Sequence, residues 1–272
     1  MTACPLTWLY APGDRPAVVA KALVSGADVV VIDLEDAVAP HRKEYAREAT
    51  AELLSQPQPV PVHVRVNALD GPLAPADLWA VAPLPGVSGL RLPKVTSAEQ
   101  ITCLVETLGR TPPLYALLET AVGIEHAYAI ASAHPTLRGI SLGEADLRAD
   151  LGVREDAGLD WSRSRVVVAA RAAGLPPPPQ SVHPDIRDLE GLAASCAHGR
   201  ALGFLGRAAI HPRQLPVIEQ AYLPTEEELE QAERIIKAAA TEHGAQALQD
   251  GTFIDAAVVT AAQRTLCLGR RR

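Results

Sequence analysis

The stretch VVVIDLEDA, residues 29–37, decides the fold of this chain. Four apolar residues in succession predict a buried strand, as in a parallel sheet with both faces covered. The run then meets Asp33, Glu35 and Asp36 within four positions. Ionised carboxylates are costly to bury unless a metal, an arginine or a helix N-terminus lies beside them. The stretch therefore predicts a buried strand whose C-terminal end needs a positive partner.

The composition limits the class of protein. Of the 272 residues, 48% are hydrophobic and 21% are charged, which is typical of a globular chain with one large domain or two small ones. The formal net charge of −7 argues against nucleic acid as the main partner, because phosphate binding needs a basic face. No apolar run approaches the roughly 20 residues of a membrane span, and no basic segment marks a signal peptide. The four cysteines form no C-x-x-C pair, so we expect a cytoplasmic protein without structural disulfides.

Short segments rich in Val, Leu and Ile alternate along the chain with longer segments of helical periodicity. Eight strands with crossover helices predict an α/β fold, a (β/α)8 TIM barrel with a C-terminal helical extension. The alternative is an open doubly wound sheet, but no G-x-G-x-x-G motif follows the first strand. The seventh strand is poor strand material because it contains prolines. The predicted strands span residues 6–11, 27–34, 60–66, 88–95, 114–119, 138–144, 178–182 and 207–212.

The pattern changes after residue 224, beyond the eighth predicted strand. Thr225 is a candidate N-cap, and glutamates follow it in the first helical turn. We therefore expect a catalytic barrel over residues 1–223 and a helical extension or lid over residues 224–272. The periodicity fits an additional packing helix equally well.

Polar residues follow the predicted strands where a barrel places its active site, at the C-terminal ends. In VHVRVN, a period of two puts Arg65 on the face opposite the valines. Arginine and acidic side chains from several strand ends therefore meet at one place. The residues concerned are Asp33, Glu35, Asp36, Arg65, Lys94, Glu119, Glu144, Asp146 and His211.

The acids predict a site for Mg²⁺, which takes one or two protein carboxylates and completes its octahedron with water and substrate. Glu119 and Asp146 follow neighbouring strands and are the candidate direct ligands. Glu35 and Asp36 would then hydrogen-bond the waters. The alternative is that these acids cap helices or pair with lysines on the surface.

Arg65 has two interpretations from sequence. It either neutralises Asp33 or Glu35 as a buried ion pair, or holds a substrate carboxylate with its planar fork. A metal beside an arginine suits a 2-oxo acid or a 3-hydroxy acid. Such a site favours cleavage or formation of a carbon–carbon bond next to a carbonyl.

A series of motifs carries a resemblance to a known family. At these motifs the chain resembles the citrate lyase beta subunit family, in the HpcH/HpaI aldolase superfamily of Mg²⁺-dependent barrels. The resemblance covers nearly the whole chain. The motifs are, in order, LYAPGDRP, VIDLEDAVAPHRKEYAR, VRVNALDGP, LRLPKV, LLETAVGI, SLGEADLRADLG and GRAAIHPRQLPVIEQAYLPTEEELEQA.

The resemblance implies an oxo-acid lyase. It implies cleavage or formation of a 3-hydroxyacyl thioester, such as citryl-, malyl- or citramalyl-CoA, with oxaloacetate, glyoxylate or pyruvate as the 2-oxo acid. The thioester is carried by CoA or an acyl carrier protein. Arg65 would bind the carboxylate, and Glu119 and Asp146 would bind Mg²⁺. Glu119 and Gly143 are also assigned to the substrate site.

The segment DGTFIDAAVV resembles a lid motif of related malyl-CoA and citramalyl-CoA lyases. There an aspartate from a neighbouring subunit enters the active site, and Asp255 takes its place in this chain. This implies a homotrimer or homohexamer. The chain has Ala256 and Ala257 where the lid motif usually continues with Pro.

Three residues have weaker signals. Arg15 in GDRP either approaches a thioester phosphate or starts the next helix. Lys94 faces the site or the barrel floor, and a Schiff-base aldolase would need it desolvated. His211 is expected to be structural. The alternatives to the thioester lyase are a Mg²⁺-dependent aldolase for free 2-oxo acids and a non-catalytic barrel that binds a keto acid.

Overall fold

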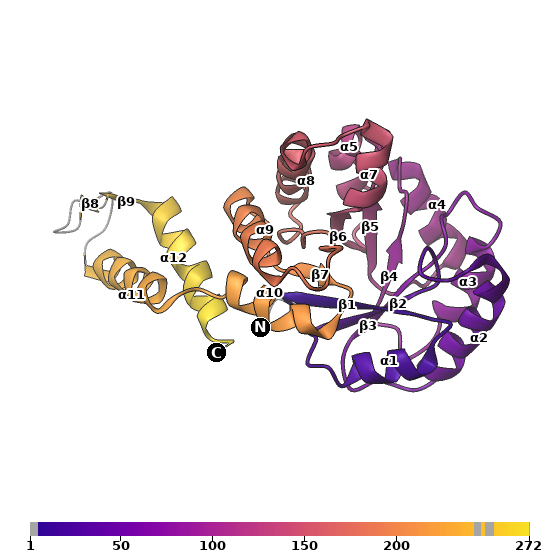
Figure 1. Ribbon diagram of the computed structural model, residues 1–272. Coiled ribbons are helices and arrows are strands. Elements are labelled where there is room, and N and C mark those ends of the chain that lie inside the picture. Colours follow the sequence, from indigo (N-terminus) through magenta and orange to yellow (C-terminus); the bar gives the residue numbers. More distant parts are fainter. Residues whose placement is uncertain (1–4, 242–245, 248–252, 272) are drawn as a thin grey trace. The chain divides into compact units, whose positions relative to one another are not determined.

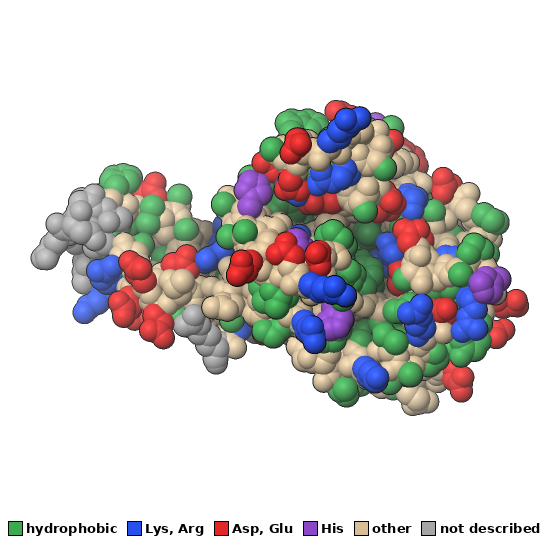
Figure 2. Space-filling model, viewed as in Figure 1, with side chains coloured by type: hydrophobic (Ala, Val, Ile, Leu, Met, Phe, Trp, Pro, Cys, Tyr) green, Lys and Arg blue, Asp and Glu red, His purple; other side chains and the backbone are tan. Residues whose placement is uncertain are grey.

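The computed structural model describes residues 5–241, 246–247 and 253–271. Within them the chain forms two compact units, Pro5–Glu219 and Gln220–Arg272 (Figure 1). No helix in the described part is long and apolar enough to cross a membrane. On the face shown in Figure 2, lysine and arginine side chains are interspersed with aspartate and glutamate, in keeping with the acidic composition.

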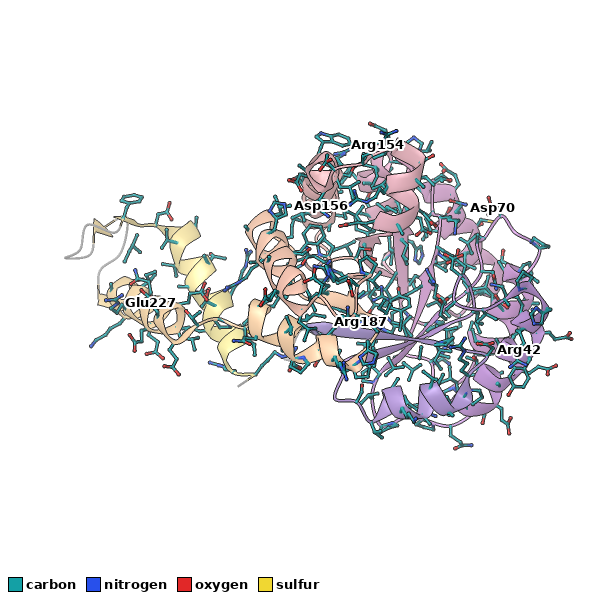
Figure 3. The ribbon with its side chains drawn as sticks, in the orientation of Figure 1. Arg42, Asp70, Arg154, Asp156, Arg187 and Glu227 are labelled. Carbon is teal, nitrogen blue, oxygen red and sulfur yellow. The ribbon has the colours of Figure 1, made fainter. Side chains whose placement is uncertain are left out.

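The first unit is built on a curled parallel sheet of seven strands in the order β6-β5-β4-β3-β2-β1-β7. Helices cover its outer face, and side chains fill its interior (Figures 1 and 3). The predicted TIM-barrel fold class is therefore confirmed. The strands are β1 (Thr7–Pro12), β2 (Val29–Asp33), β3 (Val62–Arg65), β4 (Gly89–Leu92), β5 (Leu114–Leu118), β6 (Leu137–Leu142) and β7 (Arg207–Ala209).

Helices connect the strands along the whole sheet, as parallel strands require. They are α1 (Pro16–Leu23), α2 (Lys43–Leu54), α3 (Ala74–Val81), α4 (Ala98–Leu108), α5 (Ala121–Glu125), α6 (Ala127–Ala131), α7 (Glu144–Leu151), α8 (Asp160–Ala172) and α9 (Leu189–Leu202). A further helix, α10 (Leu215–Tyr222), follows β7.

Strand β2 is buried at all five positions, as its run of apolar residues predicts. Val29 and Val31 pack inside the barrel against Trp8 and Tyr10 of β1. Because successive side chains alternate, Val30 and Ile32 face the covering helices, and both are fully buried. Both faces of the strand are therefore apolar until Asp33, which lies at the inner face where the cavity begins.

The prediction of a strand over residues 178–182 is wrong. This described segment makes only one isolated bridge, Gln180 to Arg207 of β7. Four prolines, residues 176–179, precede Gln180, and prolines have no N–H to donate to a ladder. On the other side, the Glu144 amide donates to Ser181 Oγ at 3.2 Å. A single bridge and a side-chain hydrogen bond thus stand where an eighth strand was predicted.

The second unit contains α11 (Glu226–Thr241), the short antiparallel strands β8 (Gln246–Ala247) and β9 (Phe253–Ile254), and α12 (Ala256–Gly269). Its core joins Ala232 and Ile235 of α11 to Ile254 and Ala262. The unit is helical, as expected after residue 224. The division into a catalytic domain over residues 1–223 and a lid over residues 224–272 stays a prediction.

Candidate active site

A cavity of about 300 Å³ lies in the first unit, lined by side chains at the C-terminal ends of the strands. This volume is at the lower end of the range for small-molecule sites. Seven residues that the sequence predicted for the site line this cavity. They are Asp33, Asp36, Arg65, Glu119, Gly143, Glu144 and Asp146.

Arg65 is held by two acids of the opening stretch. Its Nε donates to Asp33 Oδ1 at 2.8 Å, and its Nη2 donates to Asp33 Oδ2 at 2.5 Å. Its Nη1 lies 3.0 Å from Glu35 Oε2. Burial alone would lower the pKa of Arg65, but the hydrogen bonds to Asp33 raise it above the ordinary value. The predicted ion pair is therefore present, and Arg65 is the positive partner of both Asp33 and Glu35.

Lys94 faces this group of acids rather than the barrel floor. Its Nζ lies 2.6 Å from Glu35 Oε1 and 3.2 Å from Asp146 Oδ2. Burial lowers the pKa of Lys94, but the hydrogen bond to Glu35 outweighs this and raises it overall. A Schiff-base nucleophile needs a lowered pKa. The environment of Lys94 therefore disfavours the lysine aldolase mechanism.

The backbone at Lys94 is also unusual. Its φ of 54° makes it the one non-glycine residue with a positive φ in the described part of the chain. In this conformation the Lys94 N–H donates to Glu119 Oε1 at 2.7 Å. The strained backbone thus fixes one oxygen of Glu119.

Burial changes the acidity of Glu119. It is 3% exposed, and its pKa is raised to about 7, first by burial and then by the charge of Glu35. Gly143 makes room for it, because a Cβ at position 143 would lie 2.0 Å from Glu119 Oε2. The carboxylate occupies the space that a side chain at position 143 would fill.

Glu119 and Asp146 fit the ligand set of a hard divalent cation. Both line the cavity, and the charge of Asp146 contributes to the raised pKa of Glu119. Among the described residues, no group of three or more His, Cys, Asp or Glu side chains is placed to hold a metal. Two carboxylates beside an open cavity suit Mg²⁺, which keeps several waters or substrate oxygens.

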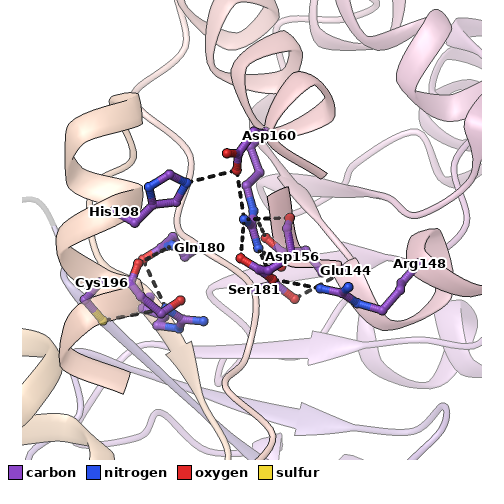
Figure 4. Close-up of polar contacts among 11 residues, drawn as sticks. Glu144, Arg148, Asp156, Asp160, Gln180, Ser181, Cys196 and His198 are labelled. Carbon is purple, nitrogen blue, oxygen red and sulfur yellow. Dashed lines mark hydrogen bonds and ion pairs between the residues drawn. The ribbon is translucent and has the colours of Figure 1, made fainter. Parts of the chain in front are cut away.

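Glu144 has a different environment from Asp146, although both begin α7. Arg163 of α8 donates to both Glu144 oxygens, from Nε at 2.9 Å and from Nη2 at 2.7 Å. Arg163 also contacts Asp156 and Asp160, and His198 Nε2 lies 2.9 Å from Asp160 Oδ1 (Figure 4). This bidentate pairing occupies Glu144 and ties the start of α7 to α8 and α9.

The other predicted residues lie in different places. Glu35 is buried between Arg65 and Lys94, and Asp36 is more exposed at 3.9 Å from each of these cations. Arg15 is exposed at the start of α1 and does not line the cavity. Asp255 belongs to the second unit, where its Oδ1 accepts the Val258 N–H at 2.9 Å as the N-cap of α12.

His211 is structural, as the sequence predicted. Its Nδ1 accepts the Arg213 N–H at 3.1 Å, and Gln214 Oε1 accepts the His211 N–H at 3.2 Å. Three of the four cysteines, Cys103, Cys196 and Cys267, are free thiols. The fourth, Cys4, lies outside the described residues.

The chain matches the sequence patterns of two known families. The pattern of the HpcH/HpaI aldolase/citrate lyase family matches residues 6–212. The chain belongs to this family. The pattern of the C–C bond lyases of the TIM-barrel fold matches residues 171–258. These two matches confirm the predicted family and enzyme class, a carbon–carbon lyase.

Curated and solved members of the family cover nearly the whole chain. The citrate lyase subunit beta-like protein of Mycobacterium tuberculosis is 38% identical over 267 residues, covering 95% of this chain and 93% of the relative. The (3S)-malyl-CoA thioesterase of Cereibacter sphaeroides is 37% identical over 270 residues, with 95% and 92% covered. The crystal structure of protein CitE from M. tuberculosis, in complex with magnesium, acetoacetate and coenzyme A, has a TM-score of 0.83. It is 36% identical, with 99% of each chain covered.

Two basic residues of the site were not singled out from the sequence. Lys43 Nζ donates to the carbonyl oxygens of Leu34 and Glu35 at 2.8 and 2.6 Å, so it holds the backbone that follows β2. Arg91 lines the cavity beside Arg65, its register partner on the neighbouring strand. A signal for Arg91 existed, because a lone arginine between two leucines in a buried strand faces inward when the leucines face outward.

Proposed function

We propose that this family member is a Mg²⁺-dependent lyase of the citrate lyase beta subunit type, acting on a 3-hydroxyacyl thioester. It would cleave or form citryl-, malyl- or citramalyl-CoA, or the same acyl group on an acyl carrier protein. The observation that carries the proposal is one cavity lined by Arg65 together with the carboxylates of Glu119 and Asp146. An arginine and two acids in one cavity suit a 2-oxo acid bound to a metal.

Glu119 and Asp146 would hold the metal. Mg²⁺ bound there supplies a Lewis acid that polarises the carbonyl of the 2-oxo acid and stabilises negative charge on its oxygen. The complex of M. tuberculosis CitE with magnesium supports the choice of this metal. Glu35 and Asp36 lie close to the same group of charges and would accept hydrogen bonds from water in the cavity.

Arg65 would bind the carboxylate of the 2-oxo acid. A guanidinium has five N–H donors, and Arg65 uses two of them in hydrogen bonds to Asp33, while its Nη1 forms an ion pair with Glu35. The remaining N–H groups are available to a ligand in the cavity that Arg65 lines. The ion pairs therefore do not compete with the clamp, because they fix the orientation of the fork that the substrate meets.

The reaction requires two proton transfers. In the cleavage direction, the 3-hydroxyl loses its proton and becomes the carbonyl of the 2-oxo acid. The bond between C2 and C3 breaks, and its electron pair leaves with the thioester enolate, which then takes up a proton. We assign the protonation of the thioester enolate to Asp255 of a neighbouring subunit in a homotrimer or homohexamer.

A thioester substrate is favoured over a free 2-oxo acid. The solved relative binds coenzyme A, and the C. sphaeroides relative is named for malyl-CoA. Arg15 is exposed at the start of α1 and is our candidate contact for the thioester carrier. The name of the C. sphaeroides relative also identifies thioester hydrolysis as the competing activity to test.

The test is turnover of citryl-, malyl- and citramalyl-CoA by the purified protein with Mg²⁺. We expect at least one of them to give a 2-oxo acid and an acyl-CoA in equal amounts, with loss of activity in EDTA and recovery with Mg²⁺. Glu119→Gln and Asp146→Asn should abolish turnover, whereas Asp150→Asn, one turn further along α7 and outside the cavity, should not. Release of free CoA without a 2-oxo acid would show a hydrolase instead.

A further inference from the structure

Arg91 of β4 is a buried cation that has no acid partner. The residue is 3% exposed, and its side chain makes no hydrogen bond or ion pair with any described residue. Its Nε is sealed from solvent and unpartnered. Burying an ionised group without acceptors is costly, so an arginine in this state indicates that an acceptor is supplied from elsewhere.

Three aromatic rings lie near the Arg91 guanidinium. Its Cζ lies 5.9 Å from the ring centroids of Trp8 and Tyr10 and 5.8 Å from that of Tyr115. These rings attract a cation but accept no hydrogen bonds in the guanidinium plane. His63 is next to this group, but burial and then the charge of Arg91 hold its pKa well below the ordinary value, so it is neutral near pH 7.

Three acids that line the cavity are engaged by cations other than Arg91. Asp33 pairs with Arg65, Glu144 pairs with Arg163, and Asp146 lies 3.2 Å from Lys94 Nζ. None of them is paired with Arg91. Of the two arginines that line the cavity, Arg65 is paired with acids, whereas Arg91 has no carboxylate partner among the described residues.

Arg91 is placed beside the predicted carboxylate clamp. Arg65 and Arg91 are register partners on β3 and β4, and both line the cavity. Both guanidinium groups approach the same ring, because Cζ of Arg65 is 5.3 Å from the Tyr10 centroid. A small ligand held by Arg65 at one end can therefore reach Arg91 with its other end.

We propose that Arg91 is a specificity-determining residue that binds a second carboxylate, at the far end of a 2-oxo dicarboxylic acid. This inference rests on the proposed function, in which Arg65, Glu119 and Asp146 take the 2-oxo carboxylate end. It favours oxaloacetate over pyruvate and glyoxylate, because only oxaloacetate of these three has a distal carboxylate. A site built around a buried charge discriminates strongly against a ligand that leaves the charge unpaired.

The test compares binding of freshly prepared oxaloacetate and pyruvate by calorimetry, with saturating Mg²⁺. We expect the unaltered protein to prefer oxaloacetate. Arg91→Met should weaken oxaloacetate binding by about tenfold to a hundredfold, as for a lost hydrogen bond to a charged group. It should change pyruvate binding by less than threefold. The variant should fold, because replacing an unpaired buried charge with an apolar side chain of similar length is often tolerated.

Two further variants keep the result interpretable. Arg91→Lys retains the charge and should lose less oxaloacetate affinity than Arg91→Met. Arg207→Met removes another buried arginine, one that donates to Ser195 Oγ at 2.9 Å and does not line the cavity, and it should leave the preference intact.

Three outcomes would overturn the proposal. If Arg91→Met lost the same affinity for both ligands, or lost none, Arg91 would not bind a distal carboxylate. The proposed function would still stand in that case. A loss of preference in Arg207→Met of the same size would show an effect of folding. Failure of the unaltered protein to bind either keto acid would refute the proposed function as well.

Discussion

Gly143 and Glu119 share one space at the mouth of the barrel. A Cβ at position 143 would lie 2.0 Å from Glu119 Oε2, far inside van der Waals contact. Glu119 is also held on its other side, where its Oε1 accepts the Lys94 N–H. The position of this carboxylate therefore depends on a residue with no side chain and on a residue with a left-handed backbone.

Gly143→Ala should displace Glu119 without removing it. We expect the dissociation constant for Mg²⁺, measured by calorimetry, to rise at least tenfold, because a metal site loosened by an ångström loses its ligand geometry. Ser141→Ala, two residues earlier and also lining the cavity, is the control and should bind Mg²⁺ normally. Unchanged Mg²⁺ affinity in Gly143→Ala would show that Glu119 is not a ligand in its present position.

Arg65→Lys separates the charge of the arginine from its shape. Lysine keeps the charge but cannot reproduce the two parallel hydrogen bonds that the arginine donates to Asp33. We expect kcat/KM to fall at least tenfold, or about 1.4 kcal/mol of transition-state stabilisation, together with a lower melting temperature. If the variant were less stable but had normal kinetics on a carboxylate substrate, Arg65 would have only a structural role through its ion pairs.

The raised pKa of Glu119 predicts a pH dependence of the metal-free protein. The group ionises near pH 4.5 when unfolded but only near pH 7 when folded, so the unfolded state releases the proton first. This group therefore lowers the free energy of unfolding as pH rises from about 4.5 to 7. Urea unfolding in EDTA at pH 5 and pH 7.5 should show a larger loss for the unaltered protein than for Glu119→Gln.

The same titration affects metal binding in the opposite direction. Mg²⁺ needs the ionised carboxylate, so its affinity should increase as pH rises toward 7 and level off above it. Equal pH dependence of unfolding in the unaltered protein and Glu119→Gln would show that this carboxylate titrates normally.

Part of this arrangement could be predicted from the sequence. The fold followed from apolar runs that end in polar residues, and the strand ends brought Arg65, Glu119 and Asp146 to one cavity because parallel strands end at the same edge. The pairing within the site could not be predicted. Arg163 binds Glu144 from a helix 19 residues further on, and no local periodicity indicates which acid of SLGEADL it chooses.

Arg163 has a structural role that substitution can measure. It is 2% exposed and contacts Glu144, Asp156 and Asp160. Arg163→Met should cost about 3–5 kcal/mol of stability by chemical denaturation, because it leaves the half-buried Glu144 carboxylate unpaired. Arg148→Met is the control, since its partner Asp156 is exposed and such pairs contribute about 1 kcal/mol or less. Equal small losses in both variants would show that Glu144 is well solvated without its arginine.

The role of Asp255 can be separated from its role as a helix cap. Its side chain caps α12 through the Val258 N–H, a contact worth about 1 kcal/mol. Asn is as good an N-cap as Asp, but its amide cannot act as an acid or a base. Asp255→Asn should therefore keep the melting temperature and lose activity. Asp255→Ala should lose both. Mixing Asp255→Asn subunits with Arg65→Ala subunits should restore activity if the carboxylate acts on a neighbour's barrel, since mixed oligomers then contain one intact site. Full activity in Asp255→Asn, measured as turnover of the best thioester, would show that this residue only caps α12.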